Sequence, residues 1–479
     1  MQLGLHVLAL GAGAPPDGAL VGNKAASLAA MAAHGLPVPP AFVIATPACT
    51  LFLESGTLPA ALTAAIDAGI CWIEAETGRR FGQAIAPLLV SVRSGAAISM
   101  PGMMDTLLNI GMCPEASAAM AEETGAAETG CSGFAADTAA RFQAQFAEIV
   151  GTPPPAAPRD QLLAAVAAVF RSWNSRRARR WRDHQGIAHD LGTAVTVQAM
   201  VFGNRCSRSG TGVLFTRNPL TGAREPYGEW LPRAQGEDVV SGKASPLPLA
   251  ALTASHPEIA AALLRAGETL EAAAQDAQDI EYTVESGRLW LLQTRTAKRS
   301  PRAAARMAVE MALEGLIARP AALARVSDAQ IALLLQPQLD PAAAAAPVLA
   351  QGTGASPGIG QGVLVLCSDE AERRAAAGEA VVLARPTTSP EDVHGMIAAA
   401  AIATELGGTT SHAAVVGRSL GKPVVVGCGE GALQALAGRA VTADGDRGLL
   451  LAGLLPLVAP AADPALQTLL AWRAAATAA

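Results

Sequence analysis

The chain has 479 residues, of which 51% are hydrophobic and 16% are charged, and its formal net charge is −6. This length exceeds that of one typical core, so we expect several domains. The negative charge balance argues against a nucleic-acid binder, and no apolar run reaches the length of about 18 residues that a membrane helix needs.

The first segment with a recognisable chemical role begins at residue 88. Residues 88–93 are apolar and rich in valine, which predicts a strand, and a glycine-containing loop follows as far as Thr106. At the strand end, Arg93 can bind phosphate oxygens through two parallel N–H donors. Gly102 lets backbone amides approach a phosphate closely. From these residues alone, a surface loop whose arginine forms a salt bridge is the favoured alternative.

A second strand is predicted over residues 193–198, and a β-hairpin over residues 279–295, with its turn at Ser286-Gly287. If Glu281 lies opposite Gln293, then Asp279 faces Arg295, and these four polar side chains share one face. The other face is then filled by Ile280, Tyr282, Val284, Trp290 and Leu292. Carboxylate, amide and guanidinium groups together suit Mg²⁺ and a triphosphate. Alternation alone instead favours a solvent-facing side of the hairpin.

Residues 301–335 have the pattern of an amphipathic helix, and a proline- and alanine-rich segment follows at 341–347. This composition favours a partly helical connector or hinge rather than a core element. From Gly352 to about Gly453, short β runs alternate with helices and glycines, which predicts a compact α/β domain of about 100 residues. The predicted strands of this domain are 362–366, 380–384, 401–403, 423–426 and 439–442. One terminal helix is expected after residue 455.

The segment around His412 is the most informative part of the sequence. A strand is expected to end near Thr404, and the Thr-Ser pair before His412 provides good N-caps for a helix that ends near Gly421. In the first helical turn, free backbone N–H groups and the positive end of the dipole face any phosphate on the imidazole. A neutral imidazole is nucleophilic near pH 7, and its phosphoramidate transfers readily. Taken alone, a histidine in a helix cap is more often structural.

Together these motifs resemble the pyruvate, phosphate dikinase family of PEP-utilizing enzymes. The segments that carry the resemblance are 21–31, 35–40, 89–106, 279–295, 355–358, 388–392 and 404–427. The resemblance implies a multi-domain α/β protein. Its parts are an ATP-grasp nucleotide-binding domain over residues 1–298, a helical linker over 299–350, a swivelling phosphohistidine domain over 351–455 and a C-terminal helix over 456–479.

The resemblance also assigns roles to residues. It makes His412 the phosphoryl carrier and Thr410 a match to a threonine that can be a regulatory phosphorylation target. Met200 would pack on adenine, Glu229 would lie near the ribose, and Arg141 would bind phosphate. The remaining nucleotide-binding residues are Lys24, Arg93, Gly102, Thr106, Asp279, Glu281, Gln293 and Arg295. Glu281 and Gln293 would also hold the metal. Before and after Lys24 this chain has asparagine and alanine where the family typically has glycines.

The implied reaction is that ATP and inorganic phosphate phosphorylate His412 with Mg²⁺ as cofactor, giving AMP and PPi. The loop at 89–106 favours phosphate over water as the second acceptor, because the related water-using dikinases carry a different loop after the Arg-Ser pair. The family normally continues into a (β/α)₈ barrel that binds pyruvate or PEP. We expect this chain to lack that barrel, so onward transfer to pyruvate needs another polypeptide.

Three alternatives stay open from the sequence. The chain could be a phosphohistidine phosphotransferase that serves another acceptor on a partner subunit, a non-catalytic nucleotide-binding regulator, or a fragment of a longer product. A homodimer is compatible with the sequence, whereas nucleic-acid and membrane partners are not expected.

The seven cysteines are scattered and include no Cys-x-x-Cys pair. We therefore expect free thiols in a cytoplasmic protein.

Overall fold

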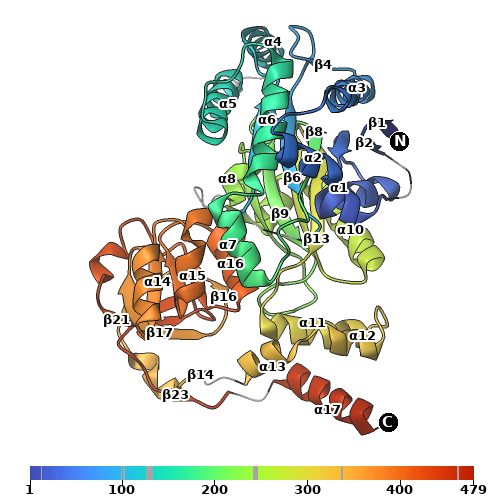
Figure 1. Cartoon of the computed structure of the whole chain (residues 1–479). Helices are drawn as coiled ribbons and strands as arrows, with labels where there is room; N and C mark the ends of the chain where they lie inside the picture. Colours follow the sequence, from blue (N-terminus) through green and yellow to red (C-terminus); the bar gives the residue numbers. More distant parts are fainter. Residues whose placement is uncertain are drawn as a thin grey trace. The chain divides into compact units, whose positions relative to one another are not determined.

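The computed structural model describes residues 1–11, 13, 15–98, 100, 103–125, 133–240, 246–335, 338–460 and 463–478. The chain forms two compact units. Unit 1 consists of Met1–Thr211, Pro232–Gln235 and Ile280–Arg295, and unit 2 consists of Gly212–Leu231, Gly236–Asp279 and Thr296–Ala479. Both units combine helices with sheets (Figure 1), so the predicted α/β class is confirmed.

Unit 1 is built on a six-stranded antiparallel sheet. Its strands, in spatial order, are β1 (Gln2–Gly4), β2 (Val7–Leu10), β3 (Ala41–Ile44), β8 (Ala194–Ala199), β6 (Val90–Gly95) and β7 (Thr106–Ile110). The short strands β4 (Arg80–Phe81) and β5 (Pro87–Leu88) pair beside it. The predicted strands at 88–93 and 193–198 are therefore confirmed as β5–β6 and β8. β-Branched and aromatic residues fill the core between this sheet and its helices, for example Phe42, Val92 and Phe170.

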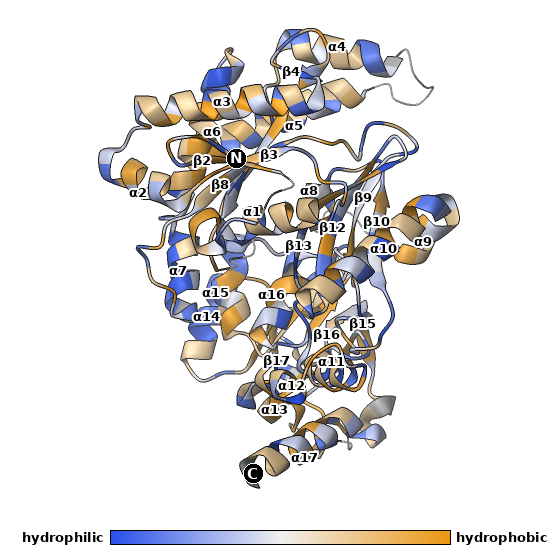
Figure 2. Ribbon diagram, turned by 90° about the vertical axis from the view of Figure 1, so that its right-hand side faces the viewer, coloured by the Kyte–Doolittle hydropathy of each residue, from blue (hydrophilic) through white to orange (hydrophobic). Residues whose placement is uncertain are grey.

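The helices of unit 1 bury one apolar stripe each against this sheet or against one another. They are α1 (Gly18–Ala33), α2 (Thr46–Ser55), α3 (Ala60–Thr77), α4 (Pro114–Gly125), α5 (Phe134–Val150), α6 (Pro158–Ser172) and α7 (Arg176–Gln185). Helix α6 packs on β6 and β7, and its interior positions are almost entirely buried. Helix α7 is blue in Figure 2 over most of its length because arginines occupy half of its positions, but one side of it is buried through Ala178, Trp181 and Arg182.

Unit 1 also contains residues 280–295, which are most of the hairpin of β12 (Gln278–Glu285) and β13 (Arg288–Thr296). The turn lies at Ser286 and Gly287, as the sequence predicts, and both residues have positive φ, 50° and 81°. Left-handed geometry at both central positions is typical of the two-residue type I′ turn that matches strand twist.

At its base, the hairpin has a hydrogen bond from the backbone N–H of Ala297 to the carbonyl oxygen of Ala277 at 2.8 Å, in line with the register that we considered, in which Gln293 lies opposite Glu281. At the other end, the two-residue turn makes Glu285 and Arg288 the first pair, so the register shifts by one residue between the turn and the base. On β13, accordingly, Leu291 is fully buried whereas Trp290 is partly exposed. Trp290 and Leu292 therefore do not share the buried face with Ile280, Tyr282 and Val284.

Unit 2 contains an eight-stranded sheet whose four central strands run parallel from β17 to β20. In spatial order the strands are β15 (Val348–Gln351), β22 (Leu449–Ala452), β21 (Ala440–Asp444), β17 (Ile359–Val365), β18 (Val381–Arg385), β19 (Ala401–Thr404), β20 (Val424–Val426) and β16 (Thr353–Ser356). The strands predicted between residues 352 and 453 are all present. Helices α14 (Ser368–Ala376), α15 (Val393–Ala398) and α16 (His412–Leu420) pack along this sheet (Figure 1).

The helices after residue 300 are α11 (Pro301–Leu313), α12 (Arg319–Ala324), α13 (Asp328–Leu334) and the terminal α17 (Pro464–Ala478). The expectation of a connector outside the core is wrong for α11. Met307 and Met311 are fully buried in an apolar cluster that α17 completes with Leu466 and Leu469. The many alanines of α11 allow this close packing. The same alanine-rich composition is also typical of a linker, so it did not indicate a core helix.

The other elements of unit 2 are β9 (Gly210–Phe215), β10 (Tyr227–Pro232), α8 (Gly236–Val240), β11 (Leu247–Pro248), α9 (Leu249–Ser255), α10 (Pro257–Ala274), β14 (Gln338–Leu339), β23 (Leu457–Val458) and the 3₁₀ turns Pro341–Ala345, Pro390–Asp392 and Gln434–Leu436. After β9, the buried Arg217 binds Glu271 of α10 and Glu314 beside α11 through both guanidinium edges. These ion pairs raise the pKa of Arg217 against the opposing effect of burial. The charge is therefore fully paired.

Across the described residues, no helix combines the length and the apolar character needed to cross a bilayer.

Free thiols are found at Cys49, Cys71, Cys113, Cys206, Cys367 and Cys428. Burial raises the pKa of the Cys49 thiol to about 11, so this thiol stays protonated and unreactive.

Candidate active site

Lys24 lies in α1, two residues after a kink at Gly22. Gly22 has φ 75°, and a Cβ at this position would lie 1.9 Å from the carbonyl oxygen of Gly95 in β6, so the close approach requires glycine. The side-chain amide of Asn23 donates to the carbonyl of Ala97 at 2.7 Å. The asparagine thus adds a bond that a glycine could not make, and it fixes the segment of Lys24 against the end of β6.

Three cationic side chains interact electrostatically with the carboxylate of Glu281 in β12, namely Lys24, Arg93 and Arg295. We call these four residues the Glu281 cluster. Arg93 donates from Nη2 to Oε2 of Glu281 at 3.1 Å. Burial alone would raise the pKa of Glu281, but the attraction of the cations outweighs it and holds the pKa below its usual value. The carboxylate is therefore ionised at neutral pH.

The pKa of Lys24 reports the electrostatic environment of this cluster. Burial lowers the pKa of its ammonium group well below the usual range, repulsion from Arg93 and Arg295 lowers it further, and Glu281 opposes this effect. Cations that repel one another in a poorly solvated site are stabilised when an anion binds between them. The arrangement in unit 1 is therefore suited to a polyanionic ligand.

Other residues predicted to bind nucleotide lie on the same sheet and hairpin. Thr106 begins β7 and lies directly opposite Arg93 in the ladder. Gln293 is buried on β13, and Met200 follows β8 immediately and packs against the core of unit 1. Gly102 lies outside the described residues.

Two predicted residues have surroundings of a different kind. Arg141 in α5 donates to the carboxylate of Asp137 at 2.9 Å, one helical turn earlier, and the side chain is exposed. Asp279 is buried on β12, two positions before Glu281, so both side chains lie on the same face of that strand.

His412 is the first residue of α16, and Ser411 is the N-cap residue with extended backbone. The helix ends at Gly421 with φ 63°, so both predicted boundaries are confirmed. The side chain is partly buried. Burial lowers the pKa of His412 to about 4, although the carboxylate of Asp392 opposes the shift. The imidazole is therefore neutral and carries a free lone pair near pH 7.

Thr388 orients this imidazole. Its Oγ1 lies 3.1 Å from Nδ1 of His412. The other ring nitrogen, Nε2, is buried and has no hydrogen-bond partner among the residues that the structure describes. When the Thr388 oxygen accepts from Nδ1–H, the lone pair of the ring lies on Nε2.

Asp392 fixes the segment that carries Thr388. Its carboxylate accepts from the backbone N–H of Ser389 at 2.9 Å and from the hydroxyl of Ser368 at 2.7 Å, and it pairs with Arg385 at 3.1 Å. The segment follows β18, and the segment of His412 follows β19, its parallel neighbour. Loops that follow adjacent parallel strands emerge at the same edge of a sheet, which is where α/β proteins build their sites.

The loop at 407–411, which precedes His412 and is called the threonine loop here, is bound by Glu229 of β10. Oε1 of Glu229 accepts from the backbone N–H of Thr409 at 2.8 Å and from its hydroxyl at 2.6 Å. Oε2 accepts from the hydroxyl of Thr410. The Tyr227 hydroxyl lies 2.8 Å from that of Thr409. We had expected Glu229 near a ribose; in this structure its carboxylate holds the threonine loop.

Arg418, one and a half turns into α16, fixes the same loop from the other side. Its Nη1 donates to the carbonyl oxygens of Ala355 and Thr409, both at 2.8 Å, and its guanidinium lies 5.8 Å from the ring centre of Phe215. We predicted a site role for neither Arg418 nor Thr388. Both lie inside recognised motifs, but a hydrogen bond between positions 24 residues apart leaves no periodic signal in a sequence.

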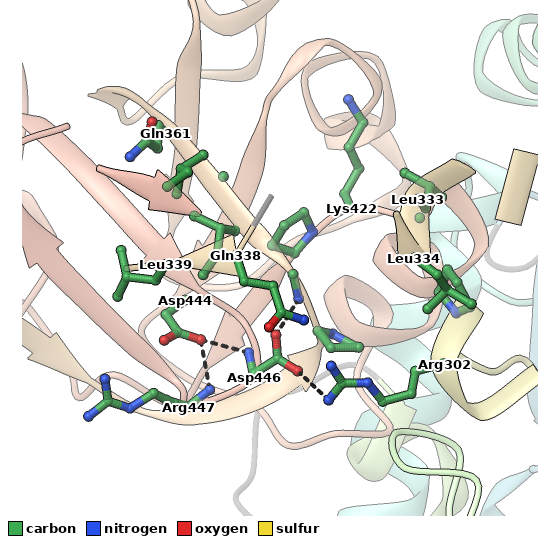
Figure 3. A pocket seen from close by; sticks show the side chains of 18 of the residues that line it. Arg302, Leu333, Leu334, Gln338, Leu339, Gln361, Lys422, Asp444, Asp446 and Arg447 are labelled. Carbon is green, nitrogen blue, oxygen red and sulfur yellow. Dashed lines mark hydrogen bonds and ion pairs between the residues drawn. The ribbon is translucent and has the colours of Figure 1, made fainter. Parts of the chain in front are cut away.

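A cavity of 700 Å³ lies elsewhere in unit 2, between residues 333–334 and 338–341 on one side and the strands β17 and β21 on the other (Figure 3). In its wall, Asp446 accepts from the backbone N–H of Gly358 at 2.9 Å and pairs with Arg302 of α11 at 3.5 Å. Asp444 accepts from the backbone N–H groups of Asp446 and Arg447. These bonds join α11 to the β21–β22 turn, so the cavity belongs to this joint.

Two family models match the chain. The model described as "Pyruvate phosphate dikinase, AMP/ATP-binding domain" matches residues 57–250, and "PEP-utilising enzyme, mobile domain" matches residues 377–448. Among curated proteins, the chain is 41% identical to "Pyruvate, phosphate dikinase 2" of Zea mays, over 95% of this chain and 58% of the relative. It is 40% identical to the pyruvate, phosphate dikinase of Rhizobium meliloti, over 96% and 59% of the two chains.

A solved structure, the NMR solution structure of Enzyme I, aligns with 21% of this chain and 38% of that chain at 28% identity. The TM-score of 0.14 means that this overlap carries no argument about the fold.

The fold and the comparisons define a chain that joins an AMP/ATP-binding domain to a PEP-utilising mobile domain. His412 and the threonine loop lie inside the second matched region, and Arg93 lies inside the first. Over nearly its whole length the chain is similar to pyruvate, phosphate dikinases. It spans a little over half the length of the curated relatives that it matches.

Proposed function

We propose that this chain is an ATP-dependent phosphotransferase of the pyruvate, phosphate dikinase type, which phosphorylates its own His412. In the proposed reaction, ATP, inorganic phosphate and His412 give AMP, PPi and phospho-His412. The release of AMP requires the bond between the α-phosphorus oxygen and the β-phosphorus to break. The formation of PPi requires the γ-phosphoryl group to pass to inorganic phosphate, which leaves the β-phosphoryl group on His412.

One observation carries this proposal: the neutral, oriented imidazole at the N-terminus of α16. With a pKa of about 4, His412 needs no base to free its lone pair at neutral pH. With Nδ1 bound to Thr388, the nucleophile is Nε2. As Nε2 bonds to phosphorus the ring becomes more positive, and an oxygen that accepts from Nδ1–H stabilises that charge. The helix terminus adds a positive dipole end near the phosphoryl oxygens.

The Glu281 cluster is the proposed binding site for the triphosphate. Lys24, Arg93 and Arg295 would bind phosphate oxygens, and their mutual repulsion supports this role because a polyanion relieves it. In this proposal Thr106, Gly102 and Asp279 complete the phosphate-binding surface, and Arg141 binds inorganic phosphate. Met200 would pack on adenine, and Glu229 would approach the ribose when the threonine loop has left it.

The residues present fit a magnesium ion. Mg²⁺ takes hard oxygen ligands, and Glu281 offers an ionised carboxylate while Gln293 offers a side-chain carbonyl. A bound magnesium ion would offset negative charge on the triphosphate. We therefore propose that Glu281 and Gln293 hold Mg²⁺ together with the nucleotide.

The final acceptor and the regulation are further parts of the proposal. The names of the relatives support pyruvate or PEP as the acceptor side of the relay, and the acceptor site would lie on another region or another chain, in a homodimer or a partner subunit. Thr410 is the proposed regulatory phosphorylation target, since it lies two residues before His412. The scattered free thiols support a cytoplasmic location.

The test uses ATP labelled with ³²P at the β-position, together with magnesium and phosphate. The expected result is protein-bound label that is acid-labile and alkali-stable and that is absent from His412→Ala. His394→Ala is the matched control, because His394 lies in the same domain on α15 and pairs with the exposed Asp369 instead; this variant should label normally. Equal labelling of His412→Ala would contradict the proposal.

A further inference from the structure

The carboxylate of Glu229 binds the threonine loop through several hydrogen bonds. One carboxylate accepts three hydrogen bonds from two consecutive residues, including a backbone N–H, and Tyr227 of the same strand adds a hydroxyl contact to Thr409. The partners are buried: Glu229 is 7% exposed, and Thr409 and Thr410 are each 3% exposed. Hydrogen bonds that include a charged group are worth about twice a neutral one, and they lose most when one partner is removed from a buried site.

The sequence of the loop is matched to this carboxylate. A Cβ at Gly408 would lie 2.8 Å from Oε1 of Glu229, so a side chain at this position would displace the carboxylate from the loop. The next two residues are threonines, and their hydroxyls supply donors at the spacing of the two carboxylate oxygens. On the other side of the loop, Arg418 donates a hydrogen bond to the carbonyl oxygen of Thr409. The loop is thus clamped between an anion and a cation immediately before the helix of His412.

We infer that Glu229 is a positioning residue that docks the threonine loop and thereby sets the first turn of α16. This inference deepens the proposed function, because the docked loop fixes where the imidazole of His412 lies. It also assigns a chemical basis to control at Thr410. A negative group on Thr410 would face the carboxylate of Glu229 in a poorly solvated site, and like charges there repel strongly. Modification of Thr410 would therefore release the loop from Glu229.

The first test measures amide hydrogen exchange at Thr409, whose N–H donates to Glu229, in the protein without nucleotide. Glu229→Gln should speed this exchange about tenfold or more, because a charged acceptor is lost. Amides of β18 should not change. The matched control is Glu405→Gln, which neutralises a buried carboxylate of the same domain that accepts from Leu433 instead; it should leave Thr409 unaffected. Unchanged exchange at Thr409 in Glu229→Gln overturns the inference.

The second test asks whether Glu229 and Thr410 act on each other. Thr410→Asp should speed exchange at Thr409 in the otherwise unchanged protein and have a clearly smaller effect in the Glu229→Gln background, where the repelling charge is gone. A simple structural disturbance would give the same acceleration in both backgrounds, and that result contradicts the proposed pairing.

The third test separates positioning from nucleotide binding. At saturating ATP, where a weaker contact with the ribose is overcome, Glu229→Gln should still slow the labelling of His412. A weaker Kd with an unchanged maximal rate would assign Glu229 to the ribose and overturn its positioning role. If even the unmodified protein gains no label, the proposed function fails, whereas the exchange measurements still decide the role of Glu229.

Discussion

In the Glu281 cluster, cations repel one another around a single ionised carboxylate, whereas in the threonine loop the hydroxyls of Thr409 and Thr410 both donate to Glu229 and the neighbouring imidazole is uncharged. The first region is electrostatically incomplete and is suited to a ligand that brings negative charge. The second region already pairs its two threonine hydroxyls within the protein, so it is suited to hold one group in a fixed orientation, although the buried hydroxyl of Ser411 has no hydrogen-bond partner among the described residues. A phosphoryl donor site and a phosphoryl carrier have these different needs.

The largest expected effect is on the incomplete region. Arg93→Met should weaken ATP binding about tenfold to hundredfold, because a guanidinium that binds phosphate oxygens contributes charged hydrogen bonds. Titration calorimetry with ATP and magnesium measures this effect. The matched control is Arg288→Met on the neighbouring hairpin, where the guanidinium stacks on Trp290, and it should bind normally. Normal binding by Arg93→Met would mean that the cluster is structural.

In the second region, around His412, Thr388→Val should leave the fold intact and slow the phosphorylation of His412 about tenfold, the value of one hydrogen bond of about 1.4 kcal/mol. The ring would lose the acceptor that fixes its tautomer. Nitrogen NMR of the imidazole should then report a mixture of Nδ1–H and Nε2–H forms. A single unchanged tautomer in Thr388→Val would show that other groups set the ring orientation.

The pH response should also distinguish the two regions. Because the pKa of His412 is lowered to about 4, its imidazole is protonated at a lower pH in the folded protein than in the unfolded chain. Between the ordinary value near 6.5 and about 4, the unfolded state therefore binds more protons, and the contribution of His412 to stability is lost as pH falls through this window. An NMR titration of the ring, assigned with His412→Gln, should give a midpoint near 4. A midpoint near 6.5 would contradict a buried neutral imidazole.

The smallest expected effect is the response to salt. Binding of tripolyphosphate to the Glu281 cluster should weaken as ionic strength rises from about 0.01 M to 0.1 M, because the Debye length falls from about 30 Å to 10 Å. Hydrogen exchange at Thr409 should change much less, since the buried carboxylate of Glu229 is screened poorly by ions. Equal salt responses would remove the electrostatic contrast between the two regions.

The sequence predicted those features that depend on local geometry. The helix beginning at His412, its end at Gly421 and the turn at Ser286-Gly287 each follow from capping or turn chemistry and are confirmed. The α/β class followed from the alternation of β runs and helices. For the hairpin, the turn residues were predicted, whereas the shift of register by one residue between the turn and the base was not.

Long-range contacts could not be predicted from the sequence. Nothing near Glu229 indicates that its partners are 180 positions away, and nothing in the alanine-rich helix α11 indicates that α17 covers it. The ribose assignment of Glu229 rested on resemblance alone and stays a prediction, as do the other nucleotide contacts. Side-chain hydrogen bonds across such separations leave no period in the sequence, because either partner could have met many other groups.

The most direct test of the account is phosphorus NMR of the protein after incubation with ATP, magnesium and phosphate. We predict a phosphoramidate resonance that couples to Nε2 of a histidine, disappears in His412→Ala and is accompanied by AMP and PPi. A phosphoryl group on Nδ1, on a hydroxyl or on a residue other than His412 would contradict the central claim.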